Sequence, residues 1–540
     1  MIKITLLGLI SLLLSSVTFA ADPLGVAAIF ADGMVLQRQM DVPVWGTAQP
    51  GDTVKVTFGG QEKTATADEA GKWMVKLDPL KASAESRTLL IASPATNNQQ
   101  PLTLHDILVG EVWLCAGQSN MDWTLKKLVA KPGGAEEDEA YQYLLNEVAT
   151  ANDPLLRQFT VGAAASPLNE LEVIQTRSGW TRAVPGQVDE FSGTGYFFGR
   201  ELRAELGVPI GLIDANRGGT DIEPWIPKRA YLKTTEGKAF YEKETAKLAP
   251  AAMQAQKAAY QKQLAEWKQQ TAAAKAAKTR APRKPADPIN ANRVPAALYN
   301  GFIHALAPYA IKGTIWYQGE NNTVHRTEQY RDSMLQLVNG WRAHWGQDTF
   351  HFFWCQLANK NTANAEPNDG DAWVQIQNQQ REVLALTEDT GMAVLNDIGA
   401  ARNIHPKNKV DVGKRLTLLA LNKAYGKDVV CSGPLYQSSR IEGNKVVITF
   451  EHAGSGLMVG TKVGLASTQP VDEPLSRFQI CGQDKQWHWA EAKITGQDTV
   501  EVWHNDIPAP VEVRYAWSSN PVGANLYNKE GLPASLFKTK

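Results

Sequence analysis

The sequence has almost no net charge. Its 540 residues include 55 Lys and Arg against 56 Asp and Glu, which leaves a formal charge of -1. A protein that holds a phosphate backbone or an anionic membrane surface by electrostatics needs a basic field, so we expect nucleic acid not to be a partner. Hydrophobic residues make up 43% of the chain, which excludes wholesale disorder. The length is that of roughly three to four domain-sized units.

Cysteine is scarce. Only Cys115, Cys355, Cys431 and Cys481 are present, spread over most of the chain without a repeating interval, so they do not form a disulfide framework. Cys115 and Cys355 sit in apolar runs and are expected to be buried, whereas the pairing of Cys431 with Cys481 is open. There is no C-x-x-C, no H-E-x-x-H and no Cys/His cluster, so we expect neither a metal nor another cofactor.

Long apolar runs are lacking beyond the N-terminus. Lys3 is followed by the mainly apolar residues 4–14 and by small residues that end at Ala20 and Ala21, the pattern of a secretory signal peptide. We expect residues 1–20 to be removed, and the protein to be secreted or periplasmic. No other apolar run reaches the roughly 18 residues of a membrane span, so no membrane association is expected after signal removal.

The remaining chain divides into three parts by the pattern of its hydrophobic and turn-forming residues. Residues 21–105 show short alternating runs broken by Gly, Asp and Pro, which predict a small antiparallel β domain. Residues 106–430 alternate near-continuous apolar strands (107–116, 210–215, 313–318, 352–357 and 392–397) with helical stretches, which predicts an α/β domain whose parallel sheet is covered on both faces. Residues 431–540 return to alternation and predict a C-terminal β domain with a sandwich-like layer.

An insertion rich in Ala, Lys and Gln interrupts the α/β unit at 229–292. Its spacing of apolar residues predicts one or two long amphipathic helices on the surface, and the basic, Pro-broken tail from Thr271 predicts a loop. The tail could contact an acidic partner, although a solvated insertion is the more common meaning of such a charge run.

The first candidate for chemistry is Ser119. It follows the apolar strand that ends at Gly117 and precedes a helix-compatible run, which is where α/β sheets place their ligands and where helix-start N–H groups can stabilise an oxyanion. On position alone, capping the helix is the more common role for such a serine. The Gly-x-Ser-x-Gly elbow is absent, because Met121 follows two residues later.

Two further polar clusters follow predicted core strands. In the first, Gln318, Glu320 and Asn322 come after the strand at 313–318, and their amides could donate to an oxyanion, although a plain turn is the alternative. In the second, His405 lies in a loop after the strand at 392–397. A lone histidine is ordinarily a surface residue, but together with Ser119 it could act as the general base of a serine hydrolase.

Six separated blocks, in order, resemble one family. They are 32–38 (DGMVLQR), 117–121 (GQSNM), 218–225 (GGTDIEPW), 316–322 (WYQGENN), 404–409 (IHPKNK) and 520–528 (NPVGANLYN). This set is similar to the sialate O-acetylesterase-like branch of the SGNH hydrolases and spans nearly the whole chain after residue 20. The resemblance implies a flavodoxin-like, three-layer α/β/α catalytic domain with flanking β-sandwich-like domains. The insertion at 229–292 is the part that we expect the family not to share closely.

The resemblance also implies roles for individual residues. Ser119 would attack an acetyl carbonyl, and His405 would take its proton, then protonate the leaving sugar hydroxyl and activate water for deacylation. The oxyanion would be held by the N–H of Ser119, by an N–H of the turn at Gly218 and Gly219, and by a side-chain amide, with Gln318 the first choice and Asn322 the second.

The sequence departs from the family at one position. SGNH hydrolases usually carry Asp two or three residues before the catalytic histidine, where this chain has Asn403 and Arg402. The group that orients His405 would then be Asp397, reaching over from the strand end, or a backbone carbonyl.

Three functions are therefore open. The first is removal of O-acetyl groups from carbohydrates, with sialic acids the first substrate expected, and the second is removal of acetyl groups from xylan or another polysaccharide. The third is a catalytically inactive carbohydrate-binding protein on the same scaffold, which the missing Asp would explain. Trp180, Trp225 and Trp373 could serve as platforms for a sugar ring, although core packing is the more common role for each of them. The sequence leaves the oligomeric state and the position of the ester undetermined.

Overall fold

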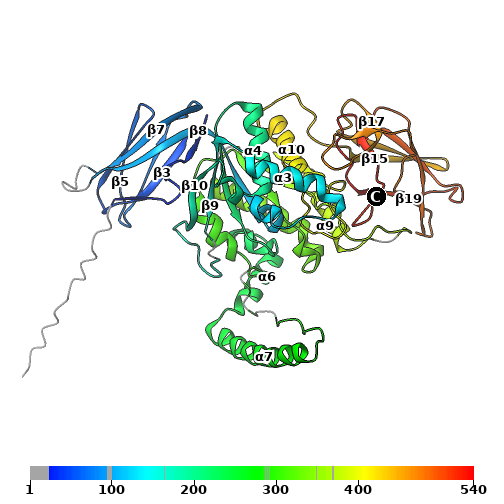
Figure 1. Cartoon of the computed structure of the whole chain (residues 1–540), viewed down its shortest axis with the longest axis horizontal. Helices are drawn as coiled ribbons and strands as arrows, with labels where there is room; N and C mark the ends of the chain where they lie inside the picture. Colours follow the sequence, from blue (N-terminus) through cyan, green and yellow to red (C-terminus); the bar gives the residue numbers. More distant parts are fainter. Residues whose placement is uncertain are drawn as a thin grey trace, which may run out of the picture.

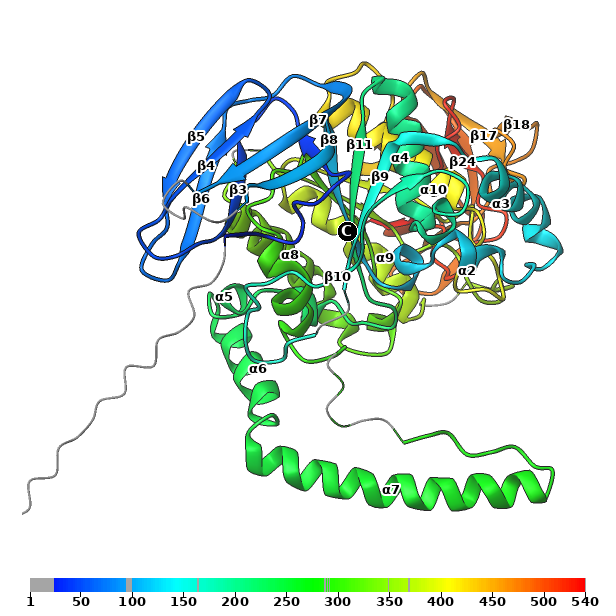
Figure 2. The same ribbon diagram turned by 60° about the vertical axis from the view of Figure 1, so that its left-hand side comes forward.

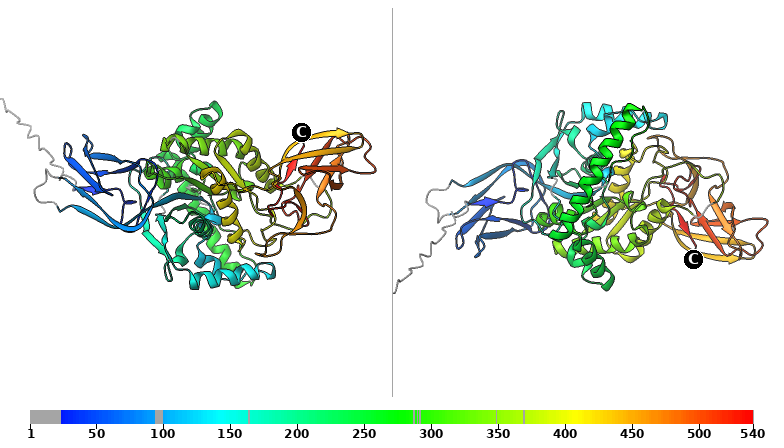
Figure 3. Two further views of the ribbon diagram at one scale, coloured as in Figure 1. Left: turned by 90° about the horizontal axis from the view of Figure 1, so that it is seen from above. Right: turned by 90° about the horizontal axis from the view of Figure 1, so that it is seen from below.

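The computed structural model describes residues 24–93, 100–162, 165–285, 288, 290, 292–347, 349–367 and 370–539. The expected signal peptide, residues 1–20, lies outside these residues. The described chain forms an elongated body with a β-rich unit at each end and an α/β unit between them (Figures 1 and 3). No helix among the described residues is long and apolar enough to cross a membrane.

The α/β unit is built on a sheet whose strands run in the order β10-β9-β11-β8-β12-β13-β14. The strands are β8 (Leu102–Gly117), β9 (Asp153–Val161), β10 (Thr176–Ala183), β11 (Ile210–Asn216), β12 (Gly313–Tyr317), β13 (His351–Cys355) and β14 (Thr390–Ala393). All neighbours pair in parallel except β10, which is antiparallel to β9 at one edge. The predicted α/β class is confirmed. Every residue of the four strands β11, β12, β13 and β14 is buried, as expected for strands covered on both faces.

Helices cover both faces of this sheet. On one face, α4 (Gly193–Leu206) and α10 (Lys409–Leu419) pack together, and Trp113 of β8 lies edge-on to Phe198 of α4 with ring centroids 5.2 Å apart. On the other face lie α8 (Tyr330–Trp345) and α9 (Ala372–Glu382), and Trp316 of β12 lies edge-on to Trp341 of α8 at 5.9 Å. A Cβ at Gly413 would lie 2.5 Å from the Phe197 carbonyl carbon, so the absence of a side chain there permits the close contact of α10 with α4.

The remaining helices lie outside these layers: α1 (Ser119–Asp122), α2 (Leu125–Val129), α3 (Asp138–Thr150), α5 (Lys228–Tyr231), α6 (Thr235–Ala246) and α7 (Pro250–Ala276). Two of them, α6 and α7, fall in the segment for which the sequence predicts surface helices. Helix α7 stands away from the rest of the molecule (Figure 2) and buries none of its residues.

The N-terminal unit contains β1 (Gly25–Val26), β2 (Val35–Gln37), β3 (Val42–Thr47), β4 (Thr53–Phe58), β5 (Gln61–Thr66), β6 (Lys72–Leu77) and β7 (Ser83–Ala92). β1, β3 and β6 form a small antiparallel sheet, whereas β7 and β2 pair with the long strand β8. Because β8 runs without a break into the central sheet, the expected boundary between residues 105 and 106 lies inside a strand.

The C-terminal unit contains β15 (Leu435–Glu442), β16 (Lys445–Glu451), β17 (Leu457–Thr461), β18 (Gln469–Pro470), β19 (Phe478–Cys481), β20 (Trp487–Trp489), β21 (Glu491–Ile494), β22 (Thr499–Trp503), β23 (Glu512–Tyr515), β24 (Leu526–Asn528) and β25 (Phe537–Lys538). Two four-stranded sheets, β15-β16-β22-β21 and β20-β19-β23-β25, contribute to one hydrophobic core. Phe450 of the first sheet lies edge-on to Phe537 of the second, at 5.6 Å.

All four cysteines are buried and free. Cys431 and Cys481, whose pairing the sequence leaves open, are not joined. The fold is therefore held by its two hydrophobic cores and not by disulfides.

Candidate active site

Ser119 lies at the carboxyl end of β8, where the chain turns into the short helix α1. Gly117 makes this turn with φ 143°, and a Cβ there would lie 2.2 Å from the Tyr317 carbonyl oxygen of the neighbouring strand. Only glycine allows this approach. The N-cap of α1 is Gln118, which makes no side-chain capping bond, and Ser119 is the first helical residue. The Ser119 hydroxyl is therefore not used as a helix cap.

His405 meets Ser119 from a loop that follows β14. The distance between His405 Nε2 and Ser119 Oγ is 2.8 Å, although the two residues are 286 positions apart in the chain. The backbone N–H of His405 donates to Asn403 Oδ1 at 2.9 Å, which fixes the loop beside the ring. A serine hydroxyl bonded to an imidazole is the pairing that general-base activation of a nucleophile requires.

An aromatic ring, and not a carboxylate, supports the imidazole. The rings of Trp123 and His405 stack with centroids 4.0 Å apart and an interplanar angle of 20°. Among the described residues, none forms a hydrogen bond with His405 Nδ1. The orientation of the ring therefore rests on this stack, on the bond to Ser119 and on the loop backbone.

The His405 imidazole is held in its neutral form. Burial, aided by the positive charges of Lys409, Lys360, Lys127 and Lys407, lowers the pKa of His405 to about 4. A neutral imidazole can accept the Ser119 proton, so the ring has the protonation state of a base at all pH values well above 4.

The expectation for Asp397 has to be corrected. Both oxygens of its carboxylate accept hydrogen bonds from the Arg415 guanidinium, at 2.6 and 2.8 Å, and both side chains are buried. Tyr527 Oη of the C-terminal unit also lies 3.4 Å from Asp397 Oδ2. Because a two-point pair with arginine satisfies the carboxylate geometrically and electrostatically, Asp397 is anchored away from His405.

The backbone around Ser119 carries two of the donors expected for an oxyanion site. Gly219, with φ 67°, and Gly218 form a turn after β11 that lies against Ser119, since a Cβ at Gly218 would be 3.6 Å from Ser119 Cβ. Within the described chain, neither the N–H of Ser119 nor that of Gly219 donates to any acceptor. Two free backbone donors beside a serine hydroxyl are the arrangement that stabilises a developing oxyanion.

The expected side-chain donors, Gln318 and Asn322, do not complete this site. Both are fully buried, and neither lines the pocket that contains Ser119. Gln318 Nε2 donates to Thr220 O at 3.0 Å and to Asn322 Oδ1 at 2.7 Å, while Asn322 Nδ2 donates to Glu223 Oε2 at 3.1 Å. Their amides hold the loops after β11 and β12 together, because buried amide groups must be satisfied within the protein.

A buried hydrogen-bond network connects Asn120, the residue after Ser119, to the loop that carries His405. Asn120 donates to the Ile404 carbonyl at 2.9 Å and to Glu320 Oε1 at 2.5 Å, and it accepts from Lys409 Nζ at 2.6 Å. Burial raises the pKa of Glu320 and lowers that of Lys409 to about 8. Asn120 therefore ties together the loops that follow β8, β12 and β14. Sequence reasoning misses its role, although Asn120 is adjacent to Ser119 in the GQSNM block.

A pocket of about 600 Å³ opens above the Ser119–His405 pair. The described residues that line it lie in the loops and helix starts that follow the parallel strands: Gln118, Ser119, Asp122, Trp123, Gly218, Gly219, Glu320, Asn321, Thr323, Val324, Lys360, Asn361, Asp371, Ala372, Trp373, Ile404 and His405. No group of three or more metal-ligating side chains occurs in the described part of the chain.

The three expected sugar platforms have different locations. Trp373 lines the pocket, and its Nε1 donates to the Ala358 carbonyl at 3.0 Å. Trp225 is fully buried and packs edge-on to Trp316, so it belongs to the core. Trp180 lies on β10, donates to the Ile29 carbonyl and packs against Phe159, outside the pocket. The expectation is therefore wrong for Trp225 and Trp180. Trp123 lines the pocket instead, and its position four residues after Ser119 is the signal that could have identified it.

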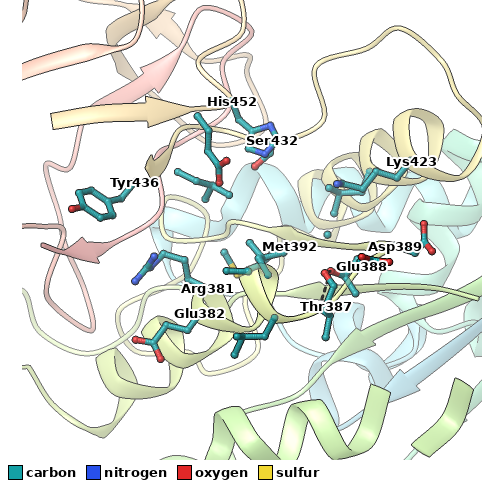
Figure 4. A pocket seen from close by; sticks show the side chains of 18 of the residues that line it. Arg381, Glu382, Thr387, Glu388, Asp389, Met392, Lys423, Ser432, Tyr436 and His452 are labelled. Carbon is teal, nitrogen blue, oxygen red and sulfur yellow. Dashed lines mark hydrogen bonds between the residues drawn. The ribbon is translucent and has the colours of Figure 1, made fainter. Parts of the chain in front are cut away.

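A larger cavity, of about 790 Å³, lies at the amino-terminal end of β14, between the α/β unit and the C-terminal unit (Figure 4). It includes a serine, Ser432, and a histidine, His452. The Ser432 hydroxyl donates to the Gly433 carbonyl at 3.0 Å, and within the described chain no hydrogen bond joins it to His452. This cavity therefore lacks the nucleophile and base pairing that Ser119 and His405 provide.

Comparison with known proteins places the chain among carbohydrate esterases. The family model described as carbohydrate esterase, sialic acid-specific acetylesterase, matches residues 109–269 and 291–420, more than half of the chain. Human sialate O-acetylesterase is 27% identical over 580 residues, covering 98% of this chain and 95% of the human protein, and the rat enzyme is 26% identical, covering 94% and 92%. A crystal structure of a carbohydrate acetylesterase from Xanthomonas citri superposes with a TM-score of 0.74 and 35% identity, covering 96% of this chain and 99% of that one.

The fold, the site and these relatives define a carboxylic ester hydrolase. Within that class, the chain belongs to the family of sialic acid-specific carbohydrate acetylesterases. The match runs through most of the expected insertion and leaves out residues 270–290, so the part not shared with the family model is narrower than 229–292.

Proposed function

We propose that this protein removes O-acetyl groups from carbohydrates, with acetylated sialic acid as its first substrate, through Ser119 as nucleophile and His405 as base. The observation that carries the proposal is the 2.8 Å contact of His405 Nε2 with Ser119 Oγ at the floor of an open pocket. The family membership supports the acetyl ester as the bond that is cleaved. The catalytic unit is proposed to be of the SGNH type, as the order of the sequence blocks suggests.

The first half of the reaction forms an acetyl-enzyme. Neutral His405 accepts the proton of Ser119 as Oγ attacks the acetyl carbonyl carbon, and the resulting oxyanion accepts hydrogen bonds from the N–H groups of Ser119 and Gly219. The protonated imidazole then gives its proton to the sugar oxygen, and the carbon–oxygen bond of the ester breaks. Each oxyanion donor of this kind is worth roughly 3 kcal/mol of transition-state stabilisation.

The second half releases acetate. His405, neutral again, takes a proton from a water molecule that attacks the acetyl-enzyme carbonyl, and it returns this proton to Ser119 Oγ as the acyl bond breaks. No carboxylate among the described residues orients the imidazole, so Trp123 keeps it in position for both halves. Burial among lysines keeps the resting ring neutral.

Acetate release tests the proposal. Purified protein is assayed on O-acetylated sialic acid and, in parallel, on acetylated xylan fragments, with Ser119→Ala and His405→Ala as controls. We expect release from sialic acid at the higher kcat/KM and loss of at least about a thousandfold in either variant, in line with the removal of a nucleophile or its base. Unchanged turnover in folded Ser119→Ala would refute the mechanism, and a higher kcat/KM on xylan would refute the choice of substrate.

Export is also proposed, on the strength of the signal-peptide pattern at residues 1–20 alone. Expression of the full chain in a bacterial host, followed by fractionation and N-terminal sequencing, tests it. The mature protein is expected to begin at Ala21 outside the cytoplasm. An N-terminus at Met1 in the cytoplasmic fraction would contradict the proposal.

A further inference from the structure

Lys360 is the only lysine or arginine among the described residues that line the pocket of Ser119 and His405. It lies on the loop that follows β13. The other lysines that act on His405 are engaged elsewhere: Lys127 pairs with Asp122 at 2.9 Å, Lys407 donates to the Leu128 and Lys131 carbonyls, and Lys409 donates to Asn120.

The ammonium group of Lys360 has no anionic partner in the described part of the protein, because no carboxylate oxygen there lies within 4.0 Å of it. Its Nζ is 5.3 Å from the ring centroid of Trp373, which also lines the pocket. A cation over an aromatic face is held by a modest attraction and keeps all three N–H groups for other acceptors.

The backbone that carries Lys360 is fixed by the C-terminal unit. The N–H of Lys360 donates to the Ser519 carbonyl at 2.8 Å, and Asn520 Nδ2 donates to the carbonyl of the next residue, Asn361, at 2.6 Å. The N–H of Asn361 donates to the Ala401 carbonyl at 3.0 Å, so the loop is also joined to the segment that leads to His405. The backbone from which the Lys360 side chain extends is thus held in place relative to the catalytic pair before any substrate binds, which lowers the entropic cost of binding.

The acidic side chains among the described residues of the same pocket are paired with a lysine, used as a helix cap or buried. Asp122 is paired with Lys127, and Asp371 Oδ1 accepts from the N–H groups of Trp373 and Val374 as the N-cap of α9. Glu320 is buried, and its Oε1 accepts from Asn120, whereas its Oε2 has no hydrogen-bond partner among the described residues. Among the described residues of the pocket lining, Lys360 is therefore the one cation that is available to a ligand.

We propose that Lys360 binds the carboxylate of an acidic sugar while its acetyl ester lies at Ser119, and so selects acidic over neutral acetylated sugars. The proposal rests on the proposed function and adds the residue that recognises the substrate class. An ammonium bonded to a carboxylate is a charge-assisted hydrogen bond, which is stronger than a neutral one. A neutral xylan fragment offers no such acceptor, so Lys360 would contribute nothing to its binding.

The test measures kcat and KM for wild type, Lys360→Met and Lys360→Arg on four esters. These are O-acetylated sialic acid, the methyl ester of that same compound, an O-acetylated hexuronic acid and p-nitrophenyl acetate. The methyl ester keeps the size of the acid and removes its charge, and the hexuronic acid distinguishes a sialic from a uronic source of the carboxylate. Lys126→Met, whose lysine pairs with Glu190 outside the pocket, is the matched control for loss of a positive charge.

For Lys360→Met we expect kcat/KM on at least one of the two acids to fall about 10- to 100-fold, mainly through KM, as for loss of a hydrogen bond between charged groups. On the methyl ester and on p-nitrophenyl acetate the value should stay within about twofold of wild type, and Lys360→Arg should recover most of the loss because it keeps the charge. Lys126→Met should behave as wild type on all four esters.

Two outcomes would overturn the proposal. If Lys360→Met loses equal activity on charged and neutral esters, Lys360 acts on the catalytic pair and not on the substrate. If it loses activity on neither acid, Lys360 does not contact the carboxylate. Failure of the proposed function is a different result, because wild type would then release acetate from none of the four esters.

Discussion

Replacing Trp123 tests the inference that stacking holds His405, for which the described residues provide no carboxylate partner. In Trp123→Ala the ring that lies 4.0 Å from the imidazole is lost, while the contact with Ser119 and the loop bonds remain. An aromatic pair contributes roughly 0.5–1.5 kcal/mol beyond its burial, so freeing the imidazole should lower kcat by about 2- to 13-fold. Trp123→Phe keeps a flat ring and should retain most of the activity.

The assay is kcat on p-nitrophenyl acetate, because so small a substrate reports on the chemistry and depends little on contacts of the sugar with the pocket that Trp123 also lines. The Tm of each variant is measured alongside, to separate a loss of positioning from a loss of folded protein. A folded Trp123→Ala variant with the kcat of wild type would refute the role of the stack. Equal losses in the Ala and Phe variants would refute it as well, since the stack is the only difference intended between them.

Three further predictions concern pH, stability and the projecting helix. Because burial lowers the pKa of His405 to about 4, the base stays neutral on acidification: about 90% of kcat/KM should persist at about pH 5, against about 3% for an ordinary histidine, and an acid limb near pH 6.5 would contradict this. Burial raises the pKa of Asp214 to about 8, so the stability that its protonated form contributes is present at low pH and is lost as pH rises from the unfolded pKa toward 8. Near pH 7, urea titrations should therefore give Asp214→Asn a free energy of unfolding on the order of 2–4 kcal/mol above that of wild type. A difference in this free energy that stays constant from about pH 4 to 8 would contradict the prediction. Replacing residues 250–276 of α7 by a short Gly/Ser linker should leave kcat/KM within about twofold and Tm unchanged, since the helix buries no residue; a loss of activity would assign it a role in the site.

The architecture could be predicted wherever local pattern determined it. The near-continuous apolar runs gave β8, β11, β12, β13 and β14 to within a few residues, because strands covered on both faces are apolar throughout. β9 was missed: Asp153, Pro154 and Arg157 interrupt its apolar pattern, although Arg157 is buried and donates to the Gly33 and Asp106 carbonyls. The burial of Arg157 in a strand can be explained only when its acceptors, which are distant in the sequence, are known.

Part of the candidate site was also predictable, because two of its residues follow strands that the apolar runs identified. Ser119 and His405 follow parallel strands, and the carboxyl ends of such strands meet at one edge, so their contact could be expected. The position of Asp397 and Gln318 after strands did not reveal which partners their side chains bind. Each has a partner, Arg415 and Asn322 respectively, that satisfies its polar group away from the pocket.

The position of Lys360 was beyond prediction from local pattern. Its loop is fixed by Ser519 and Asn520, more than 150 positions further along the chain. Its place in the pocket depends on these bonds to the C-terminal unit and on the bond from Asn361 to Ala401, none of which a local pattern reveals.

Covalent labelling tests directly whether Ser119 is the activated nucleophile. Native protein is treated with a fluorophosphonate, which reacts with activated serine hydroxyls, and the modified peptide is identified by mass spectrometry. If Ser119 is the nucleophile and His405 its base, a single adduct forms on Ser119, is lost in Ser119→Ala and forms much more slowly in His405→Ala. An adduct on another serine such as Ser432, or labelling of Ser119 at the same rate without His405, would contradict it.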